Sequence, residues 1–161
     1  MFKKIAFFLT LAAASATTYA QYEDTSVDQR IGATNNNNED SIKIGRGYIS
    51  MFQQSLANKN WAEAYMNWKW IFKNAPFAVN GTYTQGPLMF YYLITTEKDE
   101  AKKLAYFNEM MSIFEARTKN LDALNSFATP KTTSTKGNII CRKAYDYYYF
   151  CPTMDSETAY K

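Results

Sequence analysis

The sequence contains no histidine and no glycine-rich phosphate-binding loop, and it has only two cysteines. Without histidine, Ser-His-Asp and Cys-His nucleophilic sites are excluded, and most zinc sites lose a usual ligand. Gly45 and Gly47 lead into no phosphate-binding motif. Glu109 and Glu115 could form a pair of carboxylates, but both fall on the polar face of one predicted helix, which favours solvated side chains. We therefore predict a protein that is not an enzyme and that binds no cofactor and no metal.

The sequence also lacks clusters of basic residues and a hydrophobic run long enough to span a bilayer. No run of lysine or arginine indicates nucleic acid or an anionic membrane as a partner. The apolar stretch Ile5–Ala14 is too short for a membrane-spanning helix, and it follows Lys3 and Lys4. Together with the small residues up to Ala20, this pattern predicts a signal peptide at residues 1–20. The alternative is a buried first helix. We expect an exported protein, in the periplasm, at the outer membrane or outside the cell, with no transmembrane segment in the mature chain.

The next segment, Gln21–Asp40, has few large apolar side chains and contains the run Asn35–Asn38. It cannot bury enough apolar surface to order itself, so we predict a flexible, asparagine-rich leader over residues 21–40. Residues 41–161 are enough for one helical domain with a hydrophobic core. A helix-capping residue at Asp155 or Ser156, close to the end of the sequence, predicts that the domain continues in a longer protein.

Hydrophobic periodicity predicts an all-α domain. The run after Pro87 is apolar enough for a buried strand, but its helical neighbours favour a helix there too. On the last helix, Ile140, Ala144, Tyr147, Tyr148 and Cys151 are expected to share a face, and packing is the favoured role of its tyrosines. The predicted helices are Ile42–Asn58, Asn60–Asn74, Pro87–Thr95, Lys98–Lys119 and Ile139–Phe150.

The second of these helices carries the most informative pattern. Ala64 lets a neighbouring helix approach closely, Trp68 fills the space one turn later, and Pro76 follows the end of the helix. This is the alanine–aromatic–proline skeleton of the second helix of a tetratricopeptide (TPR) repeat. The preceding helix matches that pattern only in part, so a generic two-helix hairpin is the alternative. The residues that carry the repeat signature are Trp61, Ala64, Trp68, Ile71 and Pro76.

A second apolar face lies about half a turn away on the same helix and contains Met66 and Trp70. A helix that is apolar on two faces is either packed between two neighbours or exposes one face to a partner. Packing against the next hairpin is the more common outcome. Met66 and Trp70 are nevertheless our candidates for a partner surface.

Three blocks of the sequence resemble secreted TPR-like proteins of Gram-negative bacteria. They are YISMFQQSLANKNWAEAYMNWKWIFKNAP, KLAYFNEMMSIFEARTKNL and GNIICRKAYDYYYFCP, and the resemblance extends over about residues 45–161. It implies an α-solenoid of antiparallel helix hairpins that serves as a periplasmic or surface scaffold, and it brings no catalytic residues. The long connection Asn120–Lys136 departs from the pattern and interrupts its regularity.

Two functional classes remain open. The first is a non-catalytic helical-repeat scaffold that binds other proteins of the cell envelope. The second is a helical carbohydrate-binding protein, suggested by an aromatic content of 17%. A sugar-binding protein needs exposed aromatic rings, for which Trp70 and Tyr149 are the candidates. Cys141 and Cys151 fall on one predicted helix, about 15 Å apart, so we expect no disulfide between them even in an oxidising compartment.

Overall fold

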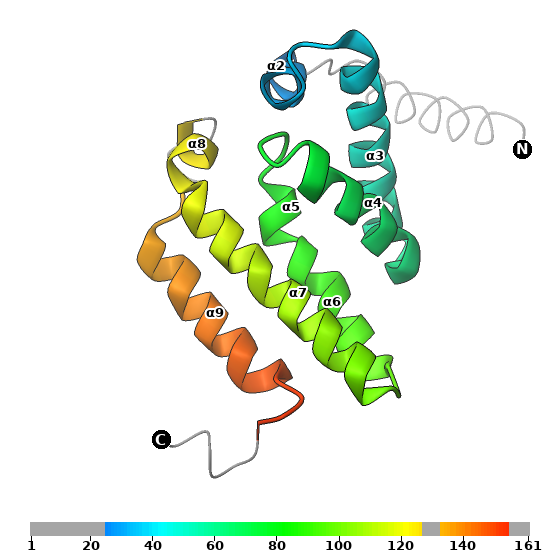
Figure 1. Cartoon of the computed structure of the whole chain (residues 1–161), viewed down its shortest axis with the longest axis vertical. Coiled ribbons are helices and arrows are strands. Elements are labelled where there is room, and N and C mark those ends of the chain that lie inside the picture. Colours follow the sequence, from blue (N-terminus) through cyan, green and yellow to red (C-terminus); the bar gives the residue numbers. More distant parts are fainter. Residues whose placement is uncertain (1–24, 127–132, 155–161) are drawn as a thin grey trace, which may run out of the picture.

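A computed structural model describes residues 25–126 and 133–154 of the chain (Figure 1). These residues form helices and connecting turns, with no β-strand among them. The predicted all-α class is therefore confirmed. The predicted signal peptide at residues 1–20 and the capping residues Asp155 and Ser156 lie outside the described residues.

Helices occupy all five predicted positions, with ends shifted by a few residues, and shorter helices join them. The helices are α2 (Thr25–Thr34), α3 (Glu39–Ala57), α4 (Trp61–Asn74), α5 (Gly81–Thr84), α6 (Gly86–Thr96), α7 (Glu100–Lys119), α8 (Leu121–Ser126) and α9 (Lys136–Phe150). Helix α3 packs on α4, and α6 packs on α7, which follow one another in sequence. Helix α9 also packs on α7, and α4 contacts α6 (Figure 1).

A tight turn folds α4 back on α3. Lys59 has a left-handed backbone with φ of 55°. The Asn60 N–H donates to the Ser55 carbonyl at 2.8 Å, and the Lys59 N–H donates to the Leu56 carbonyl at 3.1 Å. These two bonds are those of a Schellman motif, in which the left-handed residue is usually glycine. The turn satisfies carbonyls at the end of α3 and sends the chain back antiparallel to it.

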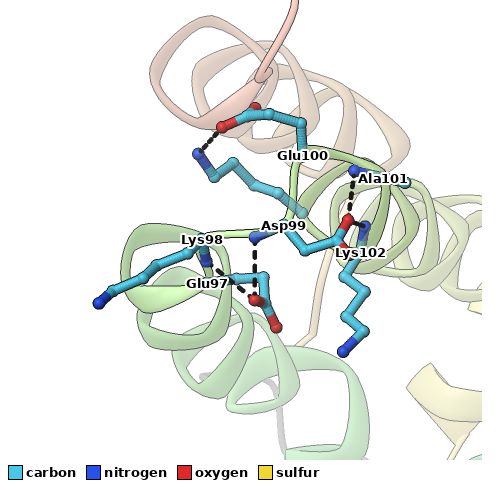
Figure 2. Close-up of polar contacts among 7 residues, drawn as sticks. Glu97, Lys98, Asp99, Glu100, Ala101 and Lys102 are labelled. Carbon is cyan, nitrogen blue, oxygen red and sulfur yellow. Dashed lines mark hydrogen bonds and ion pairs between the residues drawn. The ribbon is translucent and has the colours of Figure 1, made fainter.

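The turn between α6 and α7 is organised by side chains that accept backbone hydrogen bonds (Figure 2). Asp99 caps α7, since its carboxylate accepts from the Ala101 N–H at 2.9 Å and the Lys102 N–H at 3.1 Å. Glu97 accepts from the Lys98 N–H at 2.8 Å and the Asp99 N–H at 3.1 Å. The Asp99 and Lys98 amides lower the pKa of Glu97 because they bond its charged form.

The expectation of a flexible leader over residues 21–40 is wrong for its described part. Residues 25–34 form α2, which packs on α3, and Ile31 is fully buried. Gly45 allows this contact, because a Cβ there would stand 3.0 Å from Ile31 Cγ2. At the end of α2, the Asn35 side chain donates to the Asn74 carbonyl at 3.0 Å. The buried Ile31 and the hydrogen bond donated by Asn35 therefore order this segment, although most of its residues are polar.

The core is centred on α4, between α3 and α6. Ala64, Trp68 and Ile71 are buried, as the spacing on this helix predicts. The Trp68 indole N–H donates to the Thr82 carbonyl at 2.9 Å, and its ring packs edge-on against Phe90 at 5.2 Å. Pro76 is half-buried just beyond the helix end. Trp61, at the start of the helix, is also half-buried and stacks on Tyr92 with ring centroids 5.6 Å apart.

Of the face predicted on α9, Cys151 is half-buried against the core, but the other four residues are exposed, so packing through them is wrong. Ile140, Tyr147 and Tyr148 are about half exposed, and Ala144 is exposed as well. The helix instead packs through Ile139, Asp146 and Phe150, about a quarter turn round the axis. Its cap is Thr135, whose hydroxyl accepts from the Asn138 N–H at 3.2 Å. Because Asp146 is polar, a hydrophobic pattern does not place it on the packed face of α9.

Candidate binding groove between α3 and α4

The outer side of the α3–α4 hairpin carries an open groove of about 620 Å³. It is lined from α3 by Tyr48 and Met51, and from α4 by Met66, Asn67, Lys69, Trp70, Lys73 and Asn74. Met66, Trp70 and Lys73 follow one another at helical spacing, so they form one stripe along α4. Both members of the predicted partner surface, Met66 and Trp70, therefore line this groove.

The apolar floor of the groove is built by side chains of both helices. Tyr48 and Trp70 stack with ring centroids 4.4 Å apart and nearly parallel planes, at 7°. Met66 is 65% exposed and Met51 is 40% exposed. The next hairpin, α6–α7, does not cover Met66, so the more common outcome for a second apolar face does not occur in the described part of the chain. Flexible methionines beside stacked rings make a surface that can adapt to a ligand.

The polar groups of the groove are basic or amide, and none of its lining residues is acidic. Lys69 reaches Tyr65 and Glu109, with its ammonium 3.3 Å from the Tyr65 hydroxyl and 3.7 Å from the Glu109 carboxylate. Lys73 is exposed and makes no ion pair with the described residues. Within the described residues, Lys73, near the C-terminal end of α4, is therefore a cation of the groove without a counter-charge.

Asn67 is the unusual member of the lining. Only 6% of its surface is exposed, and its side-chain Nδ2 finds no acceptor among the described residues. A buried donor without a partner costs about 1–3 kcal/mol. Such a group in a binding groove is a hydrogen-bond donor that a ligand can use.

A second exposed aromatic surface lies on α9. Tyr145, Tyr148 and Tyr149 are between 50% and 60% exposed. Tyr149 lies 4.4 Å from Tyr145 with ring planes 41° apart, and 5.1 Å from Tyr148 with planes 85° apart. Because the rings are tilted against one another, they do not present one flat platform.

The most buried charge in the described structure belongs to the α9 interface. Asp146 is fully buried; it accepts from the Tyr91 hydroxyl at 2.7 Å and lies 3.0 Å from the Arg142 Nε. Arg142 also donates to the Tyr91 hydroxyl, and the Tyr91 ring stacks on Phe150 at 4.3 Å. Burial raises the pKa of Tyr91 to about 12. Asp146 Oδ2 and Arg142 both contact Tyr91 on α6, whereas Asp146 Oδ1 has only the ion pair with Arg142 on α9 itself; contacts of this kind between packed helices indicate a structural role.

The two carboxylates that the sequence suggested as a pair, Glu109 and Glu115, both lie on α7. Glu109 accepts from the Tyr65 hydroxyl at 2.7 Å, whereas Glu115 is bound to Lys143 at 3.0 Å, so the two carboxylates have separate partners. Burial raises the pKa of Tyr65, and Glu109 raises it further. Cys141 and Cys151 are both free, as expected.

Nowhere in residues 25–126 and 133–154 do histidine, cysteine and acidic side chains gather in a group that could hold a metal ion. In the same ranges, no helix combines the length and the apolar character needed to cross a bilayer.

Comparison with known proteins does not extend these observations, since no family model, curated protein or solved structure matches the chain. The groove therefore has to be interpreted from its own geometry. The sequence pattern found its apolar members on α4 but missed Asn67 and Lys73, because a periodicity argument assigns polar residues to solvent. The i, i+3 spacing of Tyr48 and Met51 on α3 was the available signal for the other wall.

Proposed function

We propose that this protein is a non-catalytic scaffold of TPR-like helix hairpins that binds another protein of the cell envelope through the α3–α4 groove. The observation that carries the proposal is the apolar floor of that groove, formed by the exposed Met51 and Met66 and the half-buried Tyr48–Trp70 stack. Exposed, contiguous apolar surface of this kind is typical of protein interaction sites. The order of antiparallel helices supports a repeat arrangement, in which stacked hairpins present an extended surface.

The envelope location rests on the sequence. Lys3 and Lys4, the short apolar stretch after them and Ala20 form the pattern of an export signal. A partner in the periplasm or at the outer membrane follows from that pattern. N-terminal sequencing of the exported protein tests it, with Gln21 expected as the first residue.

Site-specific cross-linking tests the groove. A photoreactive amino acid at position 66 should capture one specific protein in intact cells, whereas the same group at Ala101, exposed in the first turn of α7, should not. Met66→Glu should abolish the capture made from position 70 without changing the melting temperature, because Met66 is 65% exposed. Equal capture from positions 66 and 101 would overturn the proposal.

Carbohydrate binding is the second candidate, and the 60% exposure of Tyr149 favours it. Trp70 supports it less, because Tyr48 already covers one of its ring faces. A glycan array with wild type, Trp70→Ala and Tyr149→Ala separates the two candidates. Glycan binding that either substitution abolishes, without a cross-linked protein, would replace the scaffold proposal.

A further inference from the structure

We infer that the occupant of the α3–α4 groove is an extended, acidic segment of the partner protein. This inference rests on the proposed function, since it names the chemistry of the ligand that the groove accepts. It combines three features of the lining: an apolar floor, an ammonium at one end that forms no ion pair with the described residues, and a buried amide donor.

The charge of the lining selects the sign of the ligand. Among the described residues that line it, Lys69 and Lys73 are the charged ones, and both are basic. Lys69 is held 3.7 Å from Glu109, so part of its charge is already balanced. Lys73 has no such partner among the described residues, and a ligand carboxylate beside it would complete an ion pair. A basic ligand would meet an uncompensated like charge there.

The side-chain amide of Asn67 favours a ligand whose backbone is extended. Its Nδ2 lacks an acceptor and is shielded from water. Rotation about the last side-chain bond of asparagine is soft, so the amide can turn toward the groove that Asn67 lines. An extended segment offers free backbone carbonyls, whereas the carbonyls within a helix are already bonded to its own N–H groups. The donor therefore fits an extended backbone.

The apolar floor of the groove suits the way in which side chains alternate along an extended segment. In an extended chain, successive side chains point to opposite sides. Apolar side chains on one side would cover Met66 and the Tyr48–Trp70 stack, and the long, exposed Lys73 side chain can bend past the edge of the segment to meet acidic side chains on the other side. The inferred ligand is therefore a segment in which apolar and acidic residues alternate.

The test uses three labelled peptides and the purified protein. In the first, glutamate alternates with leucine; in the other two, lysine or glutamine replaces each glutamate. Fluorescence anisotropy should show the glutamate peptide binding more tightly than the other two, with an affinity that falls as salt is added. Equal binding of the lysine or glutamine peptide, or no binding of any peptide, would overturn the inference.

Two variants and one control locate the interaction. Lys73→Glu should weaken the glutamate peptide roughly tenfold or more. The control is Lys98→Glu, the same charge reversal at an exposed site between α6 and α7, and it should leave the affinity unchanged. Equal loss in both variants would mean that only net charge matters and would refute the site.

Asn67→Leu separates binding from folding. It removes the unsatisfied donor, so the melting temperature should rise or stay unchanged, while the peptide binds roughly three- to tenfold more weakly. An unchanged affinity would contradict the role of Asn67.

The outcome of cross-linking from position 66 keeps this inference distinct from the proposed function. If a partner is captured specifically but the glutamate peptide does not bind, the inferred acidic ligand is wrong and the proposed scaffold function still stands. If neither a partner is captured nor the peptide binds, the scaffold proposal is wrong as well. Glycan binding, or cross-linking of a second copy of this chain at position 66, would contradict both the scaffold proposal and the acidic ligand.

Discussion

Helices α4 and α9 are both rich in aromatic residues, yet only α4 packs as its sequence predicts. On α4, small and large apolar residues alternate at defined places, so Ala64 and Trp68 can face only the core. On α9, Ile139 and Ile140 are equally apolar, but the first is buried and the second is 51% exposed. A helix that carries apolar residues on every face needs a further constraint to choose one.

That further constraint on α9 is polar. Asp146 is fully buried; Tyr91 donates to its Oδ2, and Arg142 forms an ion pair with its Oδ1. A buried carboxylate is tolerated only where such partners exist, so the position of Tyr91 on α6 fixes the rotation of α9. Hydrophobic periodicity therefore places α4, and a long-range polar contact places α9. The predictions below test each half of this comparison.

The largest effect is expected on α4. Ala64→Asp places a charge where two helices meet with no exposed surface, and it should destabilise the protein by more than about 3 kcal/mol. Ala62→Asp, on the exposed side of the same helix, is the matched control and should change stability little. Thermal melting followed by circular dichroism measures both. Similar melting curves for the two variants would mean that α4 does not pack through Ala64.

A smaller loss is expected on α9. Asp146→Ala removes the acceptor of Tyr91 and the counter-charge of Arg142, which should cost about 2–3 kcal/mol. Glu115→Ala removes a solvent-exposed ion pair with Lys143 between α7 and α9, and it should cost less than about 1 kcal/mol. Urea denaturation of both variants gives the two values. If the exposed pair matters as much as the buried one, Asp146 does not fix the rotation of α9.

Replacing Gly86 or Gly47 with alanine should change the stability of the protein in opposite directions. At Gly86, a Cβ would stand 2.8 Å from the Trp68 Nε1 and 3.3 Å from Ile113, so Gly86→Ala should cost about 1–3 kcal/mol. At Gly47, nothing lies within 4 Å, so Gly47→Ala should stabilise α3 by about 0.5–1 kcal/mol. Urea denaturation measures both changes. A stabilising Gly86→Ala would show that α6 does not approach Trp68 closely.

Much of the fold could be predicted because its strongest signals are local. The periodicity of α4 and α7, and proline in the first turn of α6, depend only on nearby residues. Helix α2 could not be predicted, because its order depends on Ile31 meeting Gly45 in another helix. In the groove, Trp70 was found from spacing. Its stacking on Tyr48 and the missing acceptor of Asn67 depend on how two helices are placed.

The smallest effect concerns the alkaline limit of stability and again compares α9 with the rest of the molecule. The pKa of Tyr91 rises from about 10 in an unfolded chain to about 12 in the folded protein, mainly through burial. Between these values the unfolded state loses this proton before the folded state does, so the free energy of unfolding should fall as the pH rises from about 10 to 12. Tyr91→Phe should lower stability below pH 10 and make this alkaline decline shallower, while Tyr149→Phe, on the exposed side of α9, serves as the control. Urea denaturation of the three proteins at several alkaline pH values measures the slopes. Should Tyr91→Phe decline as steeply as wild type, the Tyr91 hydroxyl is not held in the α6–α9 interface, and the contact that orients α9 must be sought elsewhere.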